Sequence, residues 1–460
     1  MRSSVLPGAS DTIVAQATAG ARSALALIRL SGPDAHVIGS KLLRPWHTTP
    51  RRAFLASLCS PADGKEIDQA IVTIFAAPAS FTGENMLELS LHGGEIGPSL
   101  AINALLSCGA RQALPGEFTR RALLNGKLDL LQAEAVADLV DSRSRAMHDV
   151  ALGQLAGHLS ARLDALRMQI IELEALLAYD VDFPEEDDGP IPTADITGAA
   201  RNILDTIDAL LATSATGELV RSGATVVIAG EPNAGKSSLF NALAGTQRAI
   251  VTNVPGTTRD ALEAMMDIGP WPVRLVDTAG LRASADMIER LGIEVAERYL
   301  KDAAIVLVCG DDARSIARAL EHVHPLTTAT VLVVRTKSDI GQPPDSSAID
   351  EKLAYISVSA RTGEGLPVLM ERITEALSRE HDPASASTPV LTRERHRAAL
   401  ASARGEIAAF IQNYASESGL PATVAAVHLH SARGFLEELV GAVDTEEVLD
   451  RVFSAFCVGK

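Results

Sequence analysis

Residues 224–241 read ATVVIAGEPNAGKSSLFN, and this stretch decides how the central part of the chain folds. The β-branched apolar run 225–229 predicts a buried strand that breaks at Gly230. Gly235, Lys236 and Ser237 complete the spacing G-x-x-x-x-G-K-S, and helix-like sequence follows them. A tight loop of backbone N–H groups at a helix N-terminus binds phosphate. In such a loop Lys236 reaches the outer phosphates and Ser237 holds Mg²⁺, so the stretch predicts a nucleotide-binding domain.

Composition and length frame the rest of the chain. Its 460 residues suffice for two to four domains, and 47% of them are hydrophobic. A net charge of −17 excludes non-specific binding to a phosphate backbone, so contact with nucleic acid must be local or supplied by a partner. The four cysteines lie far apart, which argues against a zinc site or a disulfide frame: Cys59, Cys108, Cys309 and Cys457. With no signal peptide and no apolar run of membrane-spanning length, we expect a cytoplasmic protein.

Periodicity divides the chain into four segments. Residues 1–118 predict an α+β domain, in which apolar runs at 53–59 and 67–75 flank a hairpin signal at Asp63-Gly64. Residues 119–217 predict helices. Residues 218–378 alternate strand and helix in the manner of a parallel sheet, and residues 379–460 return to helical periodicity. We therefore predict a multidomain α/β and α protein in which a nucleotide domain is inserted into one helical bundle.

Leucines and isoleucines spaced by three or four from Leu152 to Leu177 predict one long helix with a single apolar stripe. An acidic stretch at 180–188 ends it and is interpreted as a solvated loop, with a metal site as the less favoured alternative. A second helix is predicted at 193–211, followed by a linker at 212–217. Asp444 and Glu447 predict the N-terminal cap of the last helix.

Four further motifs follow the phosphate loop in the order that guanine nucleotide hydrolases use. Residues 254–260, VPGTTRD, offer Thr258 as a switch ligand for Mg²⁺. DTAG at 277–280 follows a strand and offers Asp277 for water-mediated Mg²⁺ binding. TKSD at 336–339 offers the Asp339 carboxylate to the N–H groups of a guanine edge, and Ser359-Ala360-Arg361 offers a backbone N–H to its carbonyl. The ordered set predicts GTP binding and disfavours an ATPase.

Leu281 follows DTAG at the place where many signalling GTPases carry a water-orienting glutamine. A leucine cannot orient water, and no arginine finger is evident in the sequence. Phosphoryl transfer still requires positive charge on its transition state and a positioned water. Other groups must therefore supply both.

Motifs outside the nucleotide domain resemble one family, the MnmE (TrmE) tRNA modification GTPases. The resemblance runs nearly end to end and rests on DTIVAQAT at 11–18, SFTGE at 80–84, PGEF at 115–118, GKLDL at 126–130, DFP at 182–184 and the terminal FCVGK at 456–460. It implies that K⁺ and dimerisation of the nucleotide domains activate hydrolysis. The implied K⁺ ligands are Asn233, Thr252, Val254 and Thr257. Ser237 and Thr258 hold Mg²⁺. The implied catalytic residues are Lys236 and Glu289, and Glu289 orients the attacking water.

The motifs and the resemblance together imply a set of GTP-contacting residues: Asn233, Ala234, Gly235, Lys236, Ser237, Ser238, Thr252, Asn253, Val254, Pro255, Gly256, Thr257, Thr258, Asp277, Thr278, Ala279, Gly280, Thr336, Lys337, Asp339, Ser359, Ala360 and Arg361.

The resemblance also implies a folate-binding, dimerising N-terminal domain and partners. Its contacts to 5-formyltetrahydrofolate match Arg29, Glu88, Lys127 and Lys460, whose charges suit a pterin edge and a glutamyl tail. With a flavin-dependent partner, GidA (MnmG), the family adds an aminomethyl-type group to carbon five of the wobble uridine of certain tRNAs. The one-carbon unit comes from a folate.

Two positions leave alternatives open. The family usually has Asn where this chain has Thr336, whose hydroxyl has one donor instead of an amide's two. We expect the lost bond to cost about 1 kcal/mol in nucleotide binding, while Asp339 preserves guanine selectivity. Cys457 is either a catalytic thiol or a small buried residue.

The rival function is a ribosome-assembly or signalling GTPase without base chemistry, which has no use for the N-terminal domain or Lys460.

Overall fold

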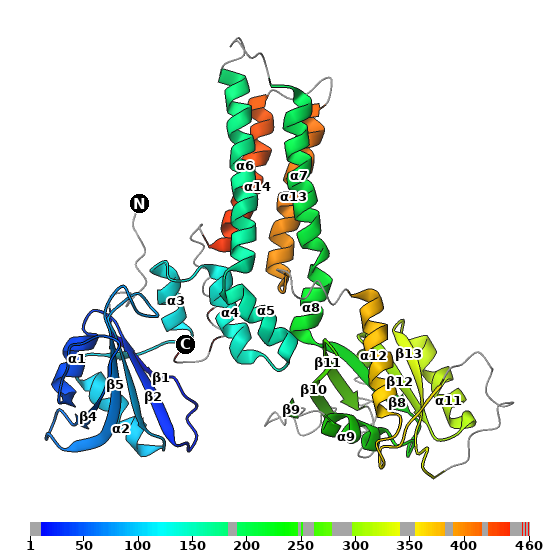
Figure 1. Ribbon diagram of the computed structural model, residues 1–460, viewed down its shortest axis with the longest axis horizontal. Coiled ribbons are helices and arrows are strands. Elements are labelled where there is room, and N and C mark those ends of the chain that lie inside the picture. Colours follow the sequence, from blue (N-terminus) through cyan, green and yellow to red (C-terminus); the bar gives the residue numbers. More distant parts are fainter. Residues whose placement is uncertain are drawn as a thin grey trace. The chain divides into compact units, whose positions relative to one another are not determined.

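The computed structural model describes residues 11–182, 191–246, 250–251, 262–277, 297–340, 355–381, 390–415 and 422–441, with Phe453, Phe456 and Gly459. The chain divides into two compact units (Figure 1). One comprises residues 1–137 with 437–460, and the other comprises residues 138–436. Within the described ranges no helix is long and apolar enough to cross a membrane.

A seven-stranded sheet forms the first unit, in the order β3-β4-β5-β6-β2-β1-β7. Its neighbours run antiparallel except for the parallel pair β1 and β7. The predicted hairpin is confirmed, because β4 and β5 pair antiparallel on either side of Asp63-Gly64. The strands are β1 Ile13–Gln16, β2 Leu25–Ser31, β3 Leu43–Arg44, β4 Ala53–Cys59, β5 Glu66–Phe75, β6 Met86–His92 and β7 Arg111–Gln112.

The two faces of this sheet have separate cores. Helices α1 (Ala35–Leu42) and α2 (Ile96–Ser107) contribute to a large buried cluster on one face, with Ile28, Leu30, Val72 and Leu89. Phe118 of α3 (Glu117–Leu124) joins a smaller cluster with Ile13, Ala15 and Met86. The alternation of buried side chains along β5 and β6 follows from the two-residue period of a strand.

Within the first unit, described residues near the C-terminus pack against the N-terminal part of the chain. Phe453 and Phe456 pack with Leu130 and Ala133 of α4 (Leu130–Asp141). A Cβ at Gly116 would come within 2.9 Å of the Phe456 Cβ, and one at Gly459 within 2.5 Å of the Gln16 carbonyl oxygen. The contacts of Gly116 with Phe456 and of Gly459 with Gln16 are therefore too close to admit side chains at these two glycines.

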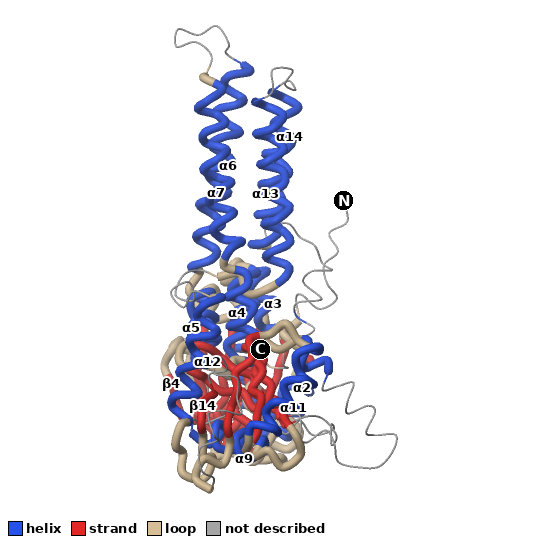
Figure 2. The backbone as a smooth tube through the Cα atoms, turned by 90° about the vertical axis from the view of Figure 1, so that its right-hand side faces the viewer, coloured by secondary structure: helices blue, strands red, loops and turns tan. Residues whose placement is uncertain are grey.

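Helices that precede the nucleotide domain in the sequence and helices that follow it form one bundle, as predicted (Figure 2). Helix α7 packs against α6 and α13, and Arg433 of α14 contacts Glu174 of α6 at 2.6 Å. The helices are α5 Arg145–Leu155, α6 His158–Asp182, α7 Thr193–Ala212, α8 Ser214–Ser222, α13 Glu394–Ala415 and α14 Ala422–Val440.

Two of our predictions for this region were wrong. The expected single long helix is broken between α5 and α6 at Gly157, which has φ +85°. The buried stripe accordingly begins at Leu159, and Leu152 on the earlier helix is half exposed. The expected linker at 212–217 is largely helical, because α8 begins at Ser214.

The nucleotide domain has the predicted, mainly parallel sheet, in the order β14-β13-β12-β8-β11-β10-β9. Strands β14, β13, β12, β8 and β11 run parallel, whereas β10 pairs antiparallel with β11 and β9 pairs antiparallel with β10. The strands are β8 Ala224–Gly230, β9 Ile250–Val251, β10 Leu262–Ile268, β11 Trp271–Asp277, β12 Ile305–Gly310, β13 Thr330–Arg335 and β14 Tyr355–Ser357.

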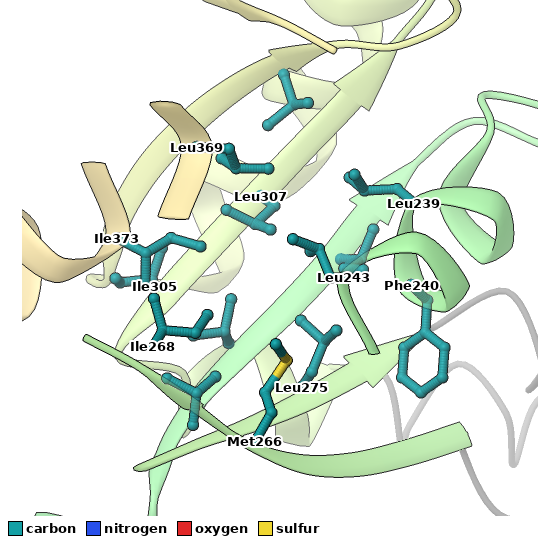
Figure 3. Close-up of a cluster of buried hydrophobic side chains, with 14 of the residues drawn as sticks. Leu239, Phe240, Leu243, Met266, Ile268, Leu275, Ile305, Leu307, Leu369 and Ile373 are labelled. Atoms are coloured by element: carbon teal, nitrogen blue, oxygen red, sulfur yellow. The ribbon is translucent and has the colours of Figure 1, made fainter. Parts of the chain in front are cut away.

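Helices on both faces bury this sheet. Helices α9 (Lys236–Thr246) and α12 (Leu366–Glu380) supply Leu239, Leu243, Leu369 and Ile373 to one core (Figure 3). Helix α11 (Ala313–Val323) contributes to the core on the other face. The short 3-10 helix η2 (His324–Leu326) follows it. Burial on both faces explains why β8 and β12 are continuous apolar runs.

Candidate nucleotide-binding site

The phosphate loop joins the carboxyl end of β8 to the N-terminus of α9. Gly230 and Gly235 have φ +151° and +81°, and Asn233 also has a positive φ of +65°. A Cβ on Gly230 would come within 2.3 Å of the Cys309 carbonyl oxygen, so only glycine fits there. The Lys236 ammonium is buried and donates to the carbonyl oxygens of Gly230 at 2.9 Å and Glu231 at 2.7 Å. The loop thus wraps around its own lysine.

Ser237 and Asp277 meet at the edge of this loop. The Ser237 hydroxyl donates to Asp277 Oδ2 at 2.6 Å, and Asp277 is fully buried at the end of β11. Strands β8 and β11 are parallel neighbours, so their carboxyl ends deliver both residues to one place. A hydroxyl beside a carboxylate is the hard oxygen set that Mg²⁺ takes, and it fits the predicted metal position.

Thr336 connects the phosphate loop to the TKSD segment. It follows β13, is 4% exposed, and its hydroxyl donates to the Ala234 carbonyl oxygen at 2.7 Å. A Cβ on Gly235 would lie 3.3 Å from the Thr336 Cβ, so the two segments are in contact. The hydroxyl also approaches the Gly310 carbonyl oxygen at 3.3 Å. The single donor of Thr336 is therefore engaged with backbone oxygens.

Asp339 is held from two sides by the Ser359-Ala360-Arg361 segment. The Ser359 hydroxyl donates to Oδ1 and Arg361 Nε donates to Oδ2, each at 2.8 Å. The hydrogen bond from Ser359, with the Arg361 charge beside it, lowers the pKa of Asp339 below its ordinary value. The carboxylate is therefore kept ionised, which is the form that accepts from a guanine edge. Arg361 itself is 76% exposed and can move aside.

Asp311 is a residue of this site that our sequence reasoning missed. It accepts from Lys337 Nζ at 2.9 Å, and this hydrogen bond lowers the pKa of Asp311. The backbone of Lys337 is left-handed, with φ +57°, and in this conformation its side chain forms the ion pair with Asp311. The available signal was its position directly after Gly310, where β12 ends beside β8 and β13.

Part of the predicted machinery lies outside the described residues. This applies to the switch and K⁺ residues Thr252, Asn253, Val254, Pro255, Gly256, Thr257 and Thr258, and to Thr278, Ala279, Gly280, Leu281 and Glu289. It also applies to Cys457, Lys460, the acidic residues 183–188 and the predicted cap at Asp444 and Glu447. The described residues bring together Asn233 through Ser238, Asp277, Thr336, Lys337, Asp339 and Ser359 through Arg361.

The predicted folate residues lie in the first unit, on its sheet and beside α3. Arg29 and Glu88 are register partners on β2 and β6, and Arg29 Nε donates to Glu88 Oε1 at 2.9 Å. Both side chains are about a quarter exposed, at 23% and 25%. Lys127 follows α3, and its side-chain stem lies against Gly83, where an added Cβ would come within 3.3 Å of Lys127 Cγ. Gly459, which precedes Lys460, lies against Gln16 on the strand beside β2.

The SFTGE and PGEF motifs meet in a partly buried network of ion pairs. Glu117 accepts from Arg111 at 2.6 Å and from Arg121 at 3.1 Å, and Arg121 also donates to Glu84 at 3.1 Å. Burial raises the pKa of the Glu117 carboxyl, but hydrogen bonds from Arg111 and the Leu114 N–H outweigh it and leave the pKa lowered. The network ties residues 80–84 to the start of α3.

Two family descriptions match this chain, and together they span most of it. The MnmE helical domain matches residues 130–457, and the GTP-binding protein TrmE N-terminus matches residues 12–127. A protein of Akkermansia muciniphila named tRNA modification GTPase MnmE is 40% identical over 98% of this chain and 99% of its own. Proteins of the same name from Moorella thermoacetica and Methylobacterium radiotolerans are 39% and 41% identical, each over 98% of this chain and 99% of its own. The chain therefore belongs to the MnmE (TrmE) family of tRNA modification GTPases.

Proposed function

We propose that this chain is a K⁺-activated GTPase that modifies carbon five of the wobble uridine of certain tRNAs. It acts with a flavin-dependent partner, GidA (MnmG), adds a carboxymethylaminomethyl or aminomethyl group, and draws the one-carbon unit from a folate. Membership of the family supports this proposal, since relatives named tRNA modification GTPase match it over 98% of its length. The main observation behind this proposal is that Lys236, Ser237 and Asp339 converge at the carboxyl ends of the parallel strands of one sheet.

The geometry of the site supports GTP hydrolysis. Lys236 exchanges its contacts with two backbone carbonyls for the outer phosphates, and Asp339 accepts from the guanine edge. Ser237 and Thr258 would hold Mg²⁺, which neutralises charge on the phosphates when it is bound. Asp277, fully buried and hydrogen-bonded to Ser237, keeps that hydroxyl oriented. Glu289 orients the attacking water in the place of the missing glutamine.

A monovalent cation would supply the positive charge that an arginine finger supplies elsewhere. Asn233 is exposed on the phosphate loop, and its amide oxygen is a hard ligand that fits K⁺. Thr252, Val254 and Thr257 would complete the set with backbone and side-chain oxygens. No other group that we assign to the site carries a positive charge to the far side of the γ-phosphate.

The folate site is proposed at Arg29, Glu88, Lys127 and Lys460. The Glu88 carboxylate suits a pterin edge, and the cations suit a glutamyl tail. The ion pair between neighbouring strands and the approach of Lys127 to Gly83 support this assignment. So does the position of Gly459 beside Gln16, because Gly459 directly precedes Lys460 in the sequence.

We further propose a homodimer formed through the predicted N-terminal domain, residues 1–118. Leu55 and Ile71 are cross-strand partners on β4 and β5 and are 56% and 47% exposed. Leu25 on β2, which points to the same face, is 59% exposed. A second copy would cover these apolar side chains. Light scattering on the purified chain tests this proposal: Ile71→Glu should lower the mass toward a monomer, whereas a wild-type monomer would contradict it.

Quantifying modified wobble nucleosides in cells that lack this protein tests the proposed function. We expect the modified uridine to disappear, to return with the wild-type chain, and to stay absent with Lys236→Ala. An unchanged nucleoside profile would instead favour the rival, a ribosome-assembly or signalling GTPase. The N-terminal match at residues 12–127 speaks against that rival, because such a factor has no use for this domain.

A further inference from the structure

The SFTGE motif at residues 80–84 has no role in the proposed chemistry so far, yet it contacts two of the predicted folate residues. The Arg29 guanidinium carbon lies 5.6 Å from the centre of the Phe81 ring, within the range of a cation–π contact. Gly83 lies against the stem of Lys127, so that an added Cβ would come within 3.3 Å of Cγ and 3.5 Å of Cδ. One short loop therefore connects residues that β2 and the end of α3 supply separately.

Arg29 needs a second contact to hold its orientation. Its Nε donates to Glu88 Oε1 at 2.9 Å, and rotation about the last side-chain bonds can still tilt the guanidinium plane around one hydrogen bond. The Phe81 ring makes a second contact with the same guanidinium. With the hydrogen bond to Glu88 and the contact with the ring, the Arg29 guanidinium is held at two points, which restricts the direction of its remaining N–H donors.

The loop itself is firmly anchored. The Ser80 hydroxyl donates to the Glu84 carbonyl oxygen at 2.6 Å, and Asn125 Nδ2 donates to the Thr82 carbonyl oxygen at 2.7 Å. The Thr82 hydroxyl lies 2.7 Å from the Ser31 hydroxyl, and Glu84 pairs with Arg121. Phe81 also packs against the cluster of Ile13, Ala15 and Phe118, which limits how far its ring can turn. A loop fixed by these contacts can impose a position on more flexible charged side chains.

We propose that residues 80–84 form a positioning wall of the folate site, in which Phe81 fixes the Arg29 guanidinium beside Glu88 and Gly83 leaves room for the Lys127 stem. This inference rests on the proposed folate function. Phe81 is a positioning residue here, because it acts on the ligand through Arg29. Gly83 is required because it has φ +78° and because a side chain would push against both Lys127 and Asn125.

Titration calorimetry of the full-length chain with 5-formyltetrahydrofolate tests the role of Phe81. Phe81→Leu keeps an apolar side chain but removes the ring, and we expect it to weaken binding about fivefold. Phe81→Tyr keeps the ring face and should bind within about twofold of wild type. The matched control is Phe75→Leu, because Phe75 packs against the same cluster whereas the ring over which Arg29 lies is that of Phe81. That control should bind like wild type, and GTP turnover should be unchanged in all three variants.

A glycine pair tests the second half of the wall. Gly83→Ala should weaken folate binding, whereas Gly64→Ala should not. Gly64 has a similar φ of +69° but has open space around it, so it carries the same backbone strain without the contact.

The outcomes separate the inference from the function on which it rests. If wild type binds the folate and Phe81→Leu or Gly83→Ala binds equally well, the wall is overturned and the folate site stands. If Phe81→Tyr is as weak as Phe81→Leu, the ring acts through shape and the contact with Arg29 is overturned. If wild type itself fails to bind, the folate part of the proposed function falls together with the wall.

Discussion

The hydroxyl of Thr336 donates to the carbonyl oxygen of Ala234 at 2.7 Å, which joins the guanine-recognition segment to the phosphate loop. An asparagine amide at this position would have two donors, one for each side. The Thr336 hydroxyl donates to the Ala234 carbonyl oxygen in the phosphate loop and makes a longer contact with the Gly310 carbonyl oxygen. The link between the two halves of the site is thus retained, and the contact we expect to be missing is the one to the base.

Replacing Thr336 separates these two contacts. Thr336→Val removes the hydroxyl at nearly constant shape, leaves the Ala234 oxygen without this donor, and should weaken GDP binding by about 1 kcal/mol. Thr336→Ser should restore it, and Thr336→Asn should tighten binding by a similar amount by adding the base contact. Fluorescence titration with a labelled nucleotide measures all three. ATP should not compete in any of them, because Asp339 is intact; competition equal to that of GTP would refute the assignment of guanine choice to Asp339.

The sequence predicts local features of this site well. The strand, loop and helix around Gly235 form from neighbouring residues whose apolar run, glycines and spacing all agree. The break at Gly157 was missed because the spacing of leucines continues on both sides of it, and a glycine within a helical pattern does not by itself end a helix. Periodicity indicates which face of a helix is apolar but not whether the helix is continuous.

Contacts between distant segments could not be predicted in the same way. Arg361 contacts Asp339, and Phe81 contacts Arg29, only because the sheet order brings their strands and loops together. The sequence assigns Asp339 and Arg361 to the nucleotide site and Arg29 to the folate site, but it does not indicate which side chains touch. These contacts depend on how strands that are far apart in the sequence are ordered in the sheet, and a local pattern does not give that order.

The cation in the reaction buffer should control GTP turnover. Exchanging Na⁺ for K⁺ at constant ionic strength and saturating Mg²⁺ should raise turnover several-fold or more, because K⁺ would stand where an arginine finger is missing. Asn233→Ala should lose this stimulation while it keeps its dependence on Mg²⁺. Equal rates of the wild-type chain in the two salts would remove the argument for K⁺.

Removing the predicted water-orienting carboxylate should affect the transition state alone. Glu289→Ala should lower single-turnover GTP hydrolysis by roughly a hundredfold and leave the GTP dissociation constant unchanged. Glu297→Ala is the charge-matched control and should hydrolyse GTP at the wild-type rate. Full activity of Glu289→Ala would show that another residue orients the water.

The ion pairs around Glu117 should make the N-terminal unit sensitive to acid. Its pKa is lowered in the folded chain from an ordinary value of 4.5. A lowered pKa means that the carboxylate stabilises the fold above the unfolded value, and that this stability is lost as the pH falls through the folded value. Glu117→Gln should therefore cost about 2 kcal/mol at pH 7, and the difference from wild type should shrink as the pH falls below about 4.

Trp46 offers a local probe for this prediction, because Trp46 and Trp271 are the two tryptophans of the chain. In a Trp271→Phe background, urea unfolding followed at Trp46 monitors the N-terminal sheet, to whose core that half-buried ring belongs. Glu66→Gln, at an exposed position on β5, serves as the control and should unfold like its parent at every pH. A loss of stability in Glu117→Gln that is the same at pH 7 and pH 3.5 would mean that the side chain acts by packing, because only an ionised carboxylate can lose its contribution on protonation.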